Sequence, residues 1–305
     1  PGLTDLFILF RENLLPILLI AGAGFLLGKL FKITPRALSQ VIFYIFSPAL
    51  VFRLLTTSQL TNQDILKTII FATIFICILA ALTWVAGKLL KLERKMMAAV
   101  LLTTLFMNAG NFGLPVTNFA FGETALAFAS LFFVATATYT NSVGVVIASS
   151  GSTSVLQAIK GLLRLPSIYG LLLGILVLRM GWQLPTVLDR TVNLLADASI
   201  PSMLVLLGLQ FVNLKLDGQL RPLILASSMR LLVAPVLAIG LSRVLELTGP
   251  AYQATVLEAG MPTAVLTTVF ADTYDLDTEL VSQAVLVSTL LSPITLTPLL
   301  AWLGA

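Results

Sequence analysis

The sequence predicts an all-α integral membrane protein of about ten transmembrane helices, in two inverted five-helix repeats with broken crossover helices four and nine. Three observations predict this class: an apolar composition, Pro and Gly landmarks that recur at one interval, and two polar interruptions inside apolar segments. Hydrophobic side chains make up 58% of the 305 residues and charged ones only 10%. Mean hydropathy is +1.01. Such a chain has too little polar surface for a soluble globule, so a lipid bilayer is expected around it.

Apolar runs long enough to cross a hydrocarbon core of about 30 Å recur from one end of the chain to the other. Their length is typical of membrane helices of about 20 residues, and not of the short alternating strands of a membrane β-barrel. We expect ten spans near residues 14–31, 37–56, 65–89, 97–119, 124–148, 167–180, 186–211, 223–244, 252–271 and 280–303.

A small, polar stretch at 149–153 divides the chain in half. We expect residues 1–150 to form the first five-helix repeat and residues 166–305 to form the second. The linker between them, 151–165, mixes apolar with basic and polar residues. This mixture predicts a short helix that lies in the cytoplasmic interface of the membrane.

Pro and Gly landmarks of the first half recur in the second half. Four matches are separated by 150 positions, and a fifth, Pro48 with Pro201, by 153. The four are Pro16 with Pro166, Gly24 with Gly174, Pro35 with Pro185, and Ala109-Gly110 with Ala259-Gly260. Because each half holds an odd number of spans, the second half enters the membrane from the opposite side. This arrangement predicts inverted repeats, which many secondary transporters share.

Lys and Arg side chains are unevenly distributed between the two predicted membrane faces. The face with the loops after spans one, three, five and seven carries eleven of them, and the opposite face carries six. Since basic loops stay in the cytoplasm, we expect an inner (plasma) membrane protein with both termini outside. The same topology explains the net charge of +4, so no nucleic-acid partner is expected.

Helix-breaking residues interrupt the fourth predicted span. Residues 105–119 contain three Asn, two Gly and one Pro, and a second interruption, 258–262, occupies the matching place in the ninth span. Such breaks persist in hydrocarbon only where protein or a watery cavity satisfies the backbone. The half-helix N-termini would then offer N–H groups and a partial positive charge to an anion. The other interpretation is an ordinary pair of kinks whose amides hold neighbouring helices together.

Polar and helix-breaking residues near these interruptions are candidates for a substrate site. Amide side chains can donate hydrogen bonds to a carboxylate, and Asn tolerates the left-handed backbone of an unwound segment. The candidate substrate-binding residues are Asn108, Asn111, Pro115, Asn141, Pro262, Thr263 and Ser47. Asn118 is a further amide donor in the first interrupted span.

Three charged residues lie inside predicted spans, where each costs about 2.5 to 3.5 kcal/mol on insertion scales. Glu258 precedes the second interruption, and its carboxyl could carry a proton or hold Na+. Asp197 could serve the same coupling, or it could pair with Arg230 to fix the register of the helices. Arg53 lies near a span end and is expected to extend towards the interface.

Other functional classes lack the residues that they need. The chain has no His and only one Cys, so the commonest metal ligand and general base are missing and no disulfide can form within the chain. Neither a serine-histidine pair nor closely spaced catalytic aspartates occur. We therefore expect no enzyme, no metal site, and no cofactor other than H+ or Na+ as a coupling ion.

Four groups of residues resemble the motifs of one family. The longest is Gly260-Met-Pro-Thr-Ala-Val-Leu-Thr-Thr-Val-Phe-Ala-Asp-Thr-Tyr-Asp-Leu-Asp, followed by Ser292-Pro-Ile-Thr-Leu. The others are Asn108 with Pro115, Leu195-Ala-Asp-Ala-Ser, and Met229-Arg230. Together they resemble the auxin efflux carrier family, which includes plant auxin carriers and bacterial carriers of malonate or related acids.

The resemblance implies a homodimer of ten-span chains. Spans one, two, six and seven would form a scaffold, and spans three, four, five, eight, nine and ten a transport domain. It also implies a secondary transporter that moves a small organic carboxylate, auxin-like or malonate-like, by an elevator-like or rocking motion. Asn108, Pro115 and Pro262 match positions beside the carboxylate, and Asn141 lies in the helix that follows. A sodium-coupled bile-acid-like symporter and an anion channel stay open as alternatives.

Overall fold

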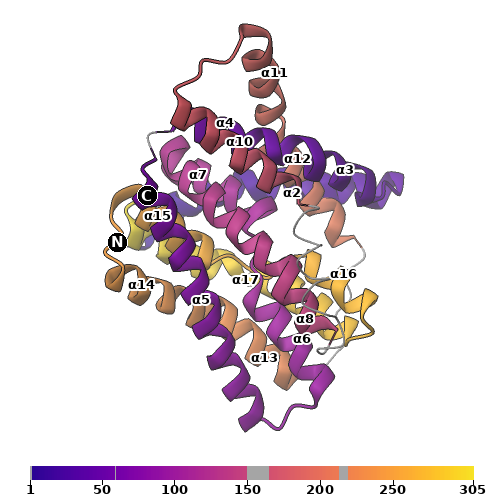
Figure 1. Ribbon diagram of the computed structural model, residues 1–305. Helices are drawn as coiled ribbons and strands as arrows, with labels where there is room; N and C mark the ends of the chain where they lie inside the picture. The colour runs from indigo at the N-terminus through magenta and orange to yellow at the C-terminus, as the bar shows by residue number, and fades with distance from the viewer. Residues whose placement is uncertain (1, 59, 150–164, 213–218) are drawn as a thin grey trace.

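The structure is a computed structural model that describes residues 2–58, 60–149, 165–212 and 219–305 (Figure 1). Within these ranges the regular elements are helices, apart from one isolated antiparallel bridge between Met107 and Thr263. The predicted interfacial helix within 151–165 lies almost entirely outside the described residues.

Short π-helical segments, labelled η, interrupt several of the helices. The elements of the first half are α1 (Leu3–Leu9), η1 (Phe10–Leu14), α2 (Leu15–Phe31), α3 (Pro35–Val41), η2 (Ile42–Phe46), α4 (Ser47–Thr57), α5 (Asn62–Leu89), α6 (Arg94–Leu105), η3 (Ala109–Gly113), α7 (Leu114–Tyr139), η4 (Thr140–Gly144) and α8 (Val145–Ala148). Those of the second half are α10 (Pro166–Met180), α11 (Thr186–Asp197), α12 (Ser199–Phe211), α13 (Leu220–Ser228), η5 (Met229–Val233), α14 (Ala234–Val244), α15 (Gly249–Ala259), α16 (Leu266–Thr273) and α17 (Thr278–Leu303).

Seven helices in the described part of the chain are long and apolar enough to cross a membrane. They run over Leu3–Phe31, Pro35–Thr57, Asn62–Leu89, Ala109–Ala148, Thr186–Phe211, Leu220–Val244 and Thr278–Leu303. A shorter apolar helix covers Pro166–Met180. The sequence predicts about ten spans, and the difference arises at the interrupted helices. The interruptions leave α6, α15 and α16 only 12, 11 and 8 residues long.

The 40-residue helix over Ala109–Ala148 contains one strongly non-helical residue. Gly122 has φ 71° and ψ −168° there, a conformation that a side chain would strain. The sequence predicts a loop between two spans at this place. Gly122 supplies a sharp change of direction between the two parts of this helix.

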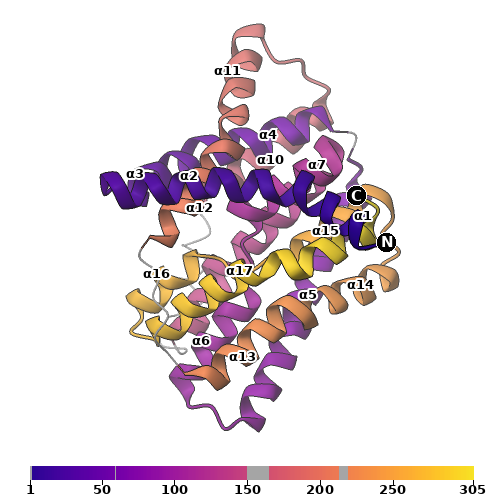
Figure 2. The same cartoon turned by 180° about the vertical axis from the view of Figure 1, so that it is seen from behind.

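The helices gather in two groups with α7 between them. Figure 2 shows α2, α3, α4, α10 and α12 together at the top and α5, α6, α13, α14 and α17 below them. The closest packing in the upper group joins α2 to α12 and α4 to α10. Glycines allow it: a Cβ on Gly24, Gly208 or Gly170 would collide with the backbone of the facing helix. Small residues at such contacts are typical of membrane helix pairs.

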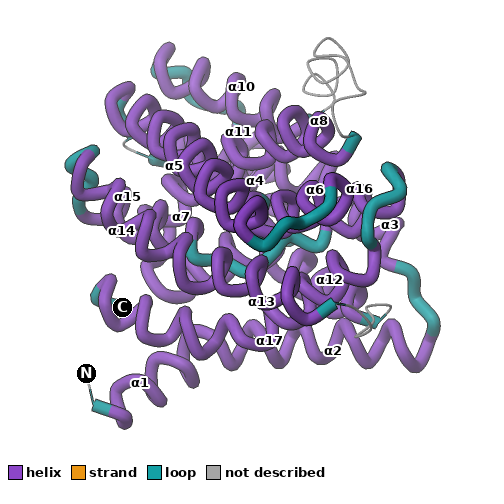
Figure 3. The backbone as a smooth tube through the Cα atoms, turned by 90° about the horizontal axis from the view of Figure 1, so that it is seen from below, coloured by secondary structure: helices purple, strands orange, loops and turns teal. Residues whose placement is uncertain are grey.

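The two ends of the chain lie on the same side of the molecule. The N- and C-terminal marks are close together in Figure 3, and α1 packs against α17. The first helix also begins earlier than residue 14, where the sequence predicted its start, because Leu3–Leu9 is already helical. The charged pair in this extension stays exposed, with Arg11 bonded to Glu12 at 2.7 Å.

An exposed ion pair links the loop before α17 to the start of α6. Lys95 Nζ donates to Asp275 Oδ2 at 2.6 Å. This hydrogen bond and the charge of Lys95 lower the pKa of the Asp275 carboxyl below its ordinary value. A carboxyl whose pKa is depressed by folding contributes stability above its unfolded pKa, and that contribution is lost as the pH falls through the folded pKa.

We therefore expect Lys95→Met to return the pKa of Asp275 towards its ordinary value. Because both side chains are exposed and screened, the thermal unfolding midpoint at neutral pH should stay nearly unchanged. Melting curves recorded as the pH is lowered, for the wild type and the variant, check this expectation. A large loss of stability in Lys95→Met at neutral pH would contradict it.

Candidate functional site

The first interruption lies between α6 and η3. Helix α6 ends at Leu105, and Phe106 is extended, with φ −104° and ψ 101°. Asn108 precedes η3 at the N-cap position, and its carbonyl accepts from the N–H of Gly113 at 2.9 Å. Pro115 lies buried where the π-helical turn η3 continues into α7. The segment therefore restarts as a helix directly after Asn108.

The second interruption crosses the first one. Met107 and Thr263 form the isolated antiparallel bridge. The backbone N–H of Asn108 donates to the carbonyl of Pro262 at 2.7 Å, and that of Ala264 donates to the carbonyl of Phe106 at 2.8 Å. Each extended segment thus satisfies the backbone that the other one exposes. The structure brings together Asn108, Pro262 and Thr263, which are far apart in the sequence.

Side chains of η5 and of the second extended segment satisfy the carbonyls where α6 and α15 end. Arg230 of η5 is fully buried and donates through Nη1 to the carbonyl of Thr104 at 2.8 Å. Its Nη2 donates to the carbonyl of Ala259. Thr263 Oγ1 donates to the carbonyl of Thr103 at 2.7 Å. One guanidinium therefore ties together the C-terminal ends of two half-helices, where partial negative charge gathers.

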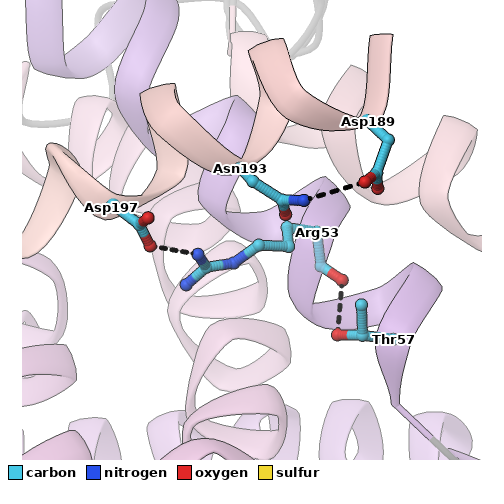
Figure 4. A network of polar contacts seen from close by, with 5 residues as sticks. All are labelled: Arg53, Thr57, Asp189, Asn193 and Asp197. Atoms are coloured by element: carbon cyan, nitrogen blue, oxygen red, sulfur yellow. Dashed lines mark hydrogen bonds and ion pairs between the residues drawn. The ribbon is translucent and has the colours of Figure 1, made fainter. Parts of the chain in front are cut away.

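This arrangement corrects the predicted role of Arg230. The sequence allowed an ion pair between Arg230 and Asp197, and that prediction is wrong. Asp197 pairs instead with Arg53, which the sequence expected to extend towards the interface (Figure 4). The physical reason is helix adjacency, because α11 packs on α4 and Arg230 faces α6 and α15.

The N-terminal ends of the other two half-helices begin beside the crossing. Helix η3 starts at Ala109 and α16 at Leu266. Their first N–H groups lack partners within the helix and carry partial positive charge. Asn108 is only 5% exposed, and its Nδ2 has no hydrogen-bond partner among the described residues. At the start of α16 the N–H groups of Thr267 and Thr268 already bond the carbonyls of Ala264 and Val265, at 3.1 and 3.0 Å, so the amide of Asn108 is the unpartnered side-chain donor on the side where the helices restart.

Glu258 lies in the last turn of α15 and is fully buried. Thr117 Oγ1 of α7 donates to Glu258 Oε1 at 3.1 Å. The other oxygen, Oε2, has no partner within the described part of the chain. A Cβ on Gly113 would collide with this carboxyl, so the glycine leaves the space that the carboxyl occupies.

Two further candidate amides lie on either side of the crossing. Asn111 Nδ2 is 3.5 Å from Gln210 Oε1 of α12, a distance at the outer limit of hydrogen bonding. Asn141 donates from Nδ2 to the carbonyl of Ala137, one turn earlier on its own helix, at 2.9 Å. One turn after Asn141, a Cβ on Gly144 would collide with the ring of Phe106. Helix η4 therefore packs directly on the first interruption.

Ser47 and Asn118 lie apart from the crossing. Ser47 is buried at the start of α4, whose main neighbours are α10 and α11. Asn118 lines a cavity of about 320 Å³ between α7 and the upper helix group. The cavity also contains Arg53, Asp197 and Glu123. In Figure 4, Arg53 reaches from α4 to Asp197 on α11, and Asn193 donates to Asp189 at 3.2 Å on the same helix.

Sequence reasoning missed three residues that the structure places at the site. Thr117 bonds Glu258, Gln210 approaches Asn111, and Ser288 Oγ of α17 accepts from the N–H of Thr263 at 3.0 Å. Gln210 could have been found as an isolated amide in the apolar helix α12. Ser and Thr are common in membrane helices, so Thr117 and Ser288 carried no distinguishing signal.

Comparison with known proteins shows that the sequence of this chain is similar to those of membrane transport proteins. A family model described as membrane transport protein matches residues 9–157 and 150–300. An uncharacterized transporter of Methanothermobacter thermautotrophicus is 28% identical over 290 residues, which cover 93% of this chain and 95% of that protein. An uncharacterized transporter of Methanocaldococcus jannaschii is 26% identical over 295 residues, 92% and 94% of the two chains. Auxin efflux carrier component 8 of Arabidopsis thaliana is 28% identical over 143 residues, 45% of this chain and 39% of the plant protein.

Proposed function

Because the chain belongs to the auxin efflux carrier family of membrane transport proteins, we propose that it is a secondary transporter of a small organic carboxylate anion. The anion, auxin-like or malonate-like, binds at the crossing of the two interrupted helices. The N-termini of η3 and α16 and the amides of Asn108 and Asn111 donate to its carboxylate. The helix group that contains the crossing then moves against the upper group and exposes the site alternately to the two sides of the membrane.

The observation that carries this proposal is the unpartnered amide of Asn108. A buried donor without an acceptor costs about 1 to 3 kcal/mol, and a bound carboxylate would supply the missing acceptor. Asn111 needs little energy to change partners, because its hydrogen bond to Gln210 is at the limit of the normal range. This bond also spans the boundary between the crossing and α12 of the upper helix group.

The proposal includes ten spans in two inverted repeats. Gly122 supports it by dividing the longest helix. The two interruptions support it because matched Ala-Gly pairs 150 residues apart border them: Ala109-Gly110 begins η3 directly after the first, and Ala259-Gly260 ends α15 directly before the second. We assign the scaffold to spans one, two, six and seven, corresponding to α1–α4 and α10–α12, and the transport domain to the remaining spans. The functional unit is a homodimer in the inner (plasma) membrane with both termini outside, as the resemblance and the basic loops imply.

Uptake into proteoliposomes tests the substrate site. Labelled malonate and labelled indole-3-acetate are the two probes, and the variants are Asn108→Ala and Asn111→Ala. We expect uptake at low substrate concentration to fall about ten- to a hundredfold, since each variant removes one hydrogen bond to a charged group, worth about 1.5 to 3 kcal/mol.

The control is Asn62→Ala, an exposed amide at the start of α5 that should transport like the wild type. Unchanged rates in both Asn108→Ala and Asn111→Ala would exclude the crossing as the substrate site.

Two other functions are separated by simple measurements. A sodium-coupled bile-acid-like symporter could use the same crossing, and its uptake would require a Na+ gradient. An anion channel would give unitary currents in a planar bilayer and no saturation of transport. Saturable uptake without unitary currents supports the secondary transporter.

A further inference from the structure

The carboxyl of Glu258 occupies an unusual place for an acidic side chain. It is fully buried in the same helix group as the crossing, and it receives one hydrogen bond, from Thr117. A buried carboxylate is costly unless a counter-charge or several donors compensate for its lost hydration. The single hydroxyl donor of Thr117 does not meet this requirement. The neutral, protonated form is therefore the one that suits the site as the structure shows it.

Arg230 is the charged group that comes nearest to serving as a counter-charge. It bonds the carbonyl of Ala259, the residue after Glu258, but both of its terminal nitrogens are engaged by carbonyls, and its Nε has no partner in the described part of the chain. Helices α5, η3, α7, α14 and α17 pack against α15. Their charged side chains are exposed or half-exposed: Asp64, Lys67, Lys88, Glu123, Arg243 and Glu279. In the described part of the chain, Glu258 thus faces no cation that could neutralise it directly.

The space around the carboxyl suits a proton better than a sodium ion. Na+ is a hard cation that needs several oxygen ligands, like the other hard cations of proteins. Here Oε1 is held by the Thr117 hydroxyl, and the carboxyl packs directly against the backbone of Gly113. A proton needs no additional volume, whereas a metal ion would have to push η3 and α15 apart.

Glu258 also lies close enough to the proposed anion site to be coupled to it. It packs on Gly113, whose N–H is bonded to the carbonyl of Asn108 at 2.9 Å. An anion bound beside Asn108 repels a carboxylate, so it favours the protonated form of Glu258. Linkage requires the reciprocal effect, in which a protonated Glu258 strengthens binding of the anion.

We propose that Glu258 carries the proton that accompanies the organic anion, so that one carboxylate and one H+ cross the membrane together. This inference rests on the proposed function. Glu258 takes up a proton when the anion binds and the carboxyl is enclosed against Gly113. It releases the proton when the moving helix group has exposed the crossing to the other side and water reaches the carboxyl.

Gradient-driven uptake tests the proposal. Proteoliposomes with the wild type should accumulate labelled malonate or indole-3-acetate when the outside is more acidic than the inside, without Na+. Glu258→Gln keeps the shape and the neutral charge of the protonated side chain. We expect it to lose accumulation driven by the pH gradient but to keep exchange of external labelled acid for internal unlabelled acid.

Glu279→Gln, which removes an exposed carboxyl at the start of α17, is the matched control and should accumulate substrate like the wild type. Full pH-driven accumulation by Glu258→Gln would overturn the proposal. Accumulation by the wild type that follows a Na+ gradient and ignores the pH gradient would also overturn it.

Infrared spectroscopy provides a readout that does not depend on transport. At neutral pH, where exposed carboxyls are ionised, the wild type in lipid should show a band of a protonated carboxylic acid that is absent from Glu258→Gln and present in Glu279→Gln. An identical spectrum for the wild type and Glu258→Gln across the pH range would overturn the proton site. If the wild type takes up no organic acid, the proposed transport function fails, and the infrared titration alone decides whether Glu258 holds a proton.

Discussion

Replacing Arg230 by Met is expected to cause a large loss of stability. Two carbonyls at the ends of α6 and α15, those of Thr104 and Ala259, lose their donors in this variant. Each orphaned carbonyl costs about 1 to 3 kcal/mol, roughly 2 to 6 kcal/mol for the two, less the desolvation cost of the buried guanidinium that Met removes. Water cannot easily replace the guanidinium, because the side chain is fully buried.

The charge of Arg230 has a second consequence for the crossing. Both carbonyls lie at helix C-termini, where the helix dipoles concentrate partial negative charge, and the guanidinium offsets both of them. Met fills most of the space without supplying a donor or a charge. We therefore expect the two half-helices to lose their fixed relative position along with the stability.

Thermal unfolding in detergent checks this prediction. The control is Arg243→Met, which removes an exposed guanidinium that lies 6.0 Å from the ring centroid of Trp302. Loss of an exposed cation–π contact costs only about 0.5 to 1 kcal/mol. If Arg230→Met and Arg243→Met lowered the unfolding midpoint equally, the capping role of Arg230 would be wrong.

Replacing Gly113 by Ala is expected to destabilise the protein through its contact with Glu258. The backbone of Gly113 is helical, with φ −65° and ψ −52°, so alanine fits the local conformation. In an unobstructed helix this change would stabilise by about 0.5 to 1 kcal/mol. Here the added Cβ collides with the Glu258 carboxyl, and overpacking of this kind costs about 1 to 3 kcal/mol.

A double-mutant cycle isolates this contact. In a Glu258→Ala background the carboxyl is gone, so Gly113→Ala should become neutral or stabilising. Gly240→Ala is the control, because Gly240 is helical and has open space where its Cβ would be. Thermal unfolding of the four members of the cycle measures the coupling. An equal cost of Gly113→Ala in both backgrounds would show that Glu258 does not occupy this space.

Much of the site could be predicted from local chemistry. The clusters of Asn, Gly and Pro in apolar segments are incompatible with an uninterrupted membrane helix, so the two breaks were visible without coordinates. The repeated interval then suggested that the breaks at Asn108 and Pro262 are partners, and the structure joins them through their backbones. Interruptions of membrane helices can be predicted from sequence, because every backbone N–H and C=O group that they free must find a hydrogen-bond partner.

The partners of charged residues could not be predicted in the same way. Asp197 pairs with Arg53, and Arg230 bonds two carbonyls, although the sequence allowed a pair between Asp197 and Arg230. Helix α11 carries a polar face with Asp189, Asn193 and Asp197 four residues apart, but its sequence does not say which helix that face meets. Which charge meets which group depends on helix adjacency and rotation.

The sequence by itself determined the membrane class, the two interruptions and the polar residue types beside them, because composition and backbone hydrogen bonding depend on local chemistry. The tertiary structure alone decided that Arg230 caps both half-helices, that Glu258 packs on Gly113 and that Asn111 faces Gln210. These contacts join helices that are distant in the chain. They follow from the packing of the helices, and the residues of a single segment do not specify that packing.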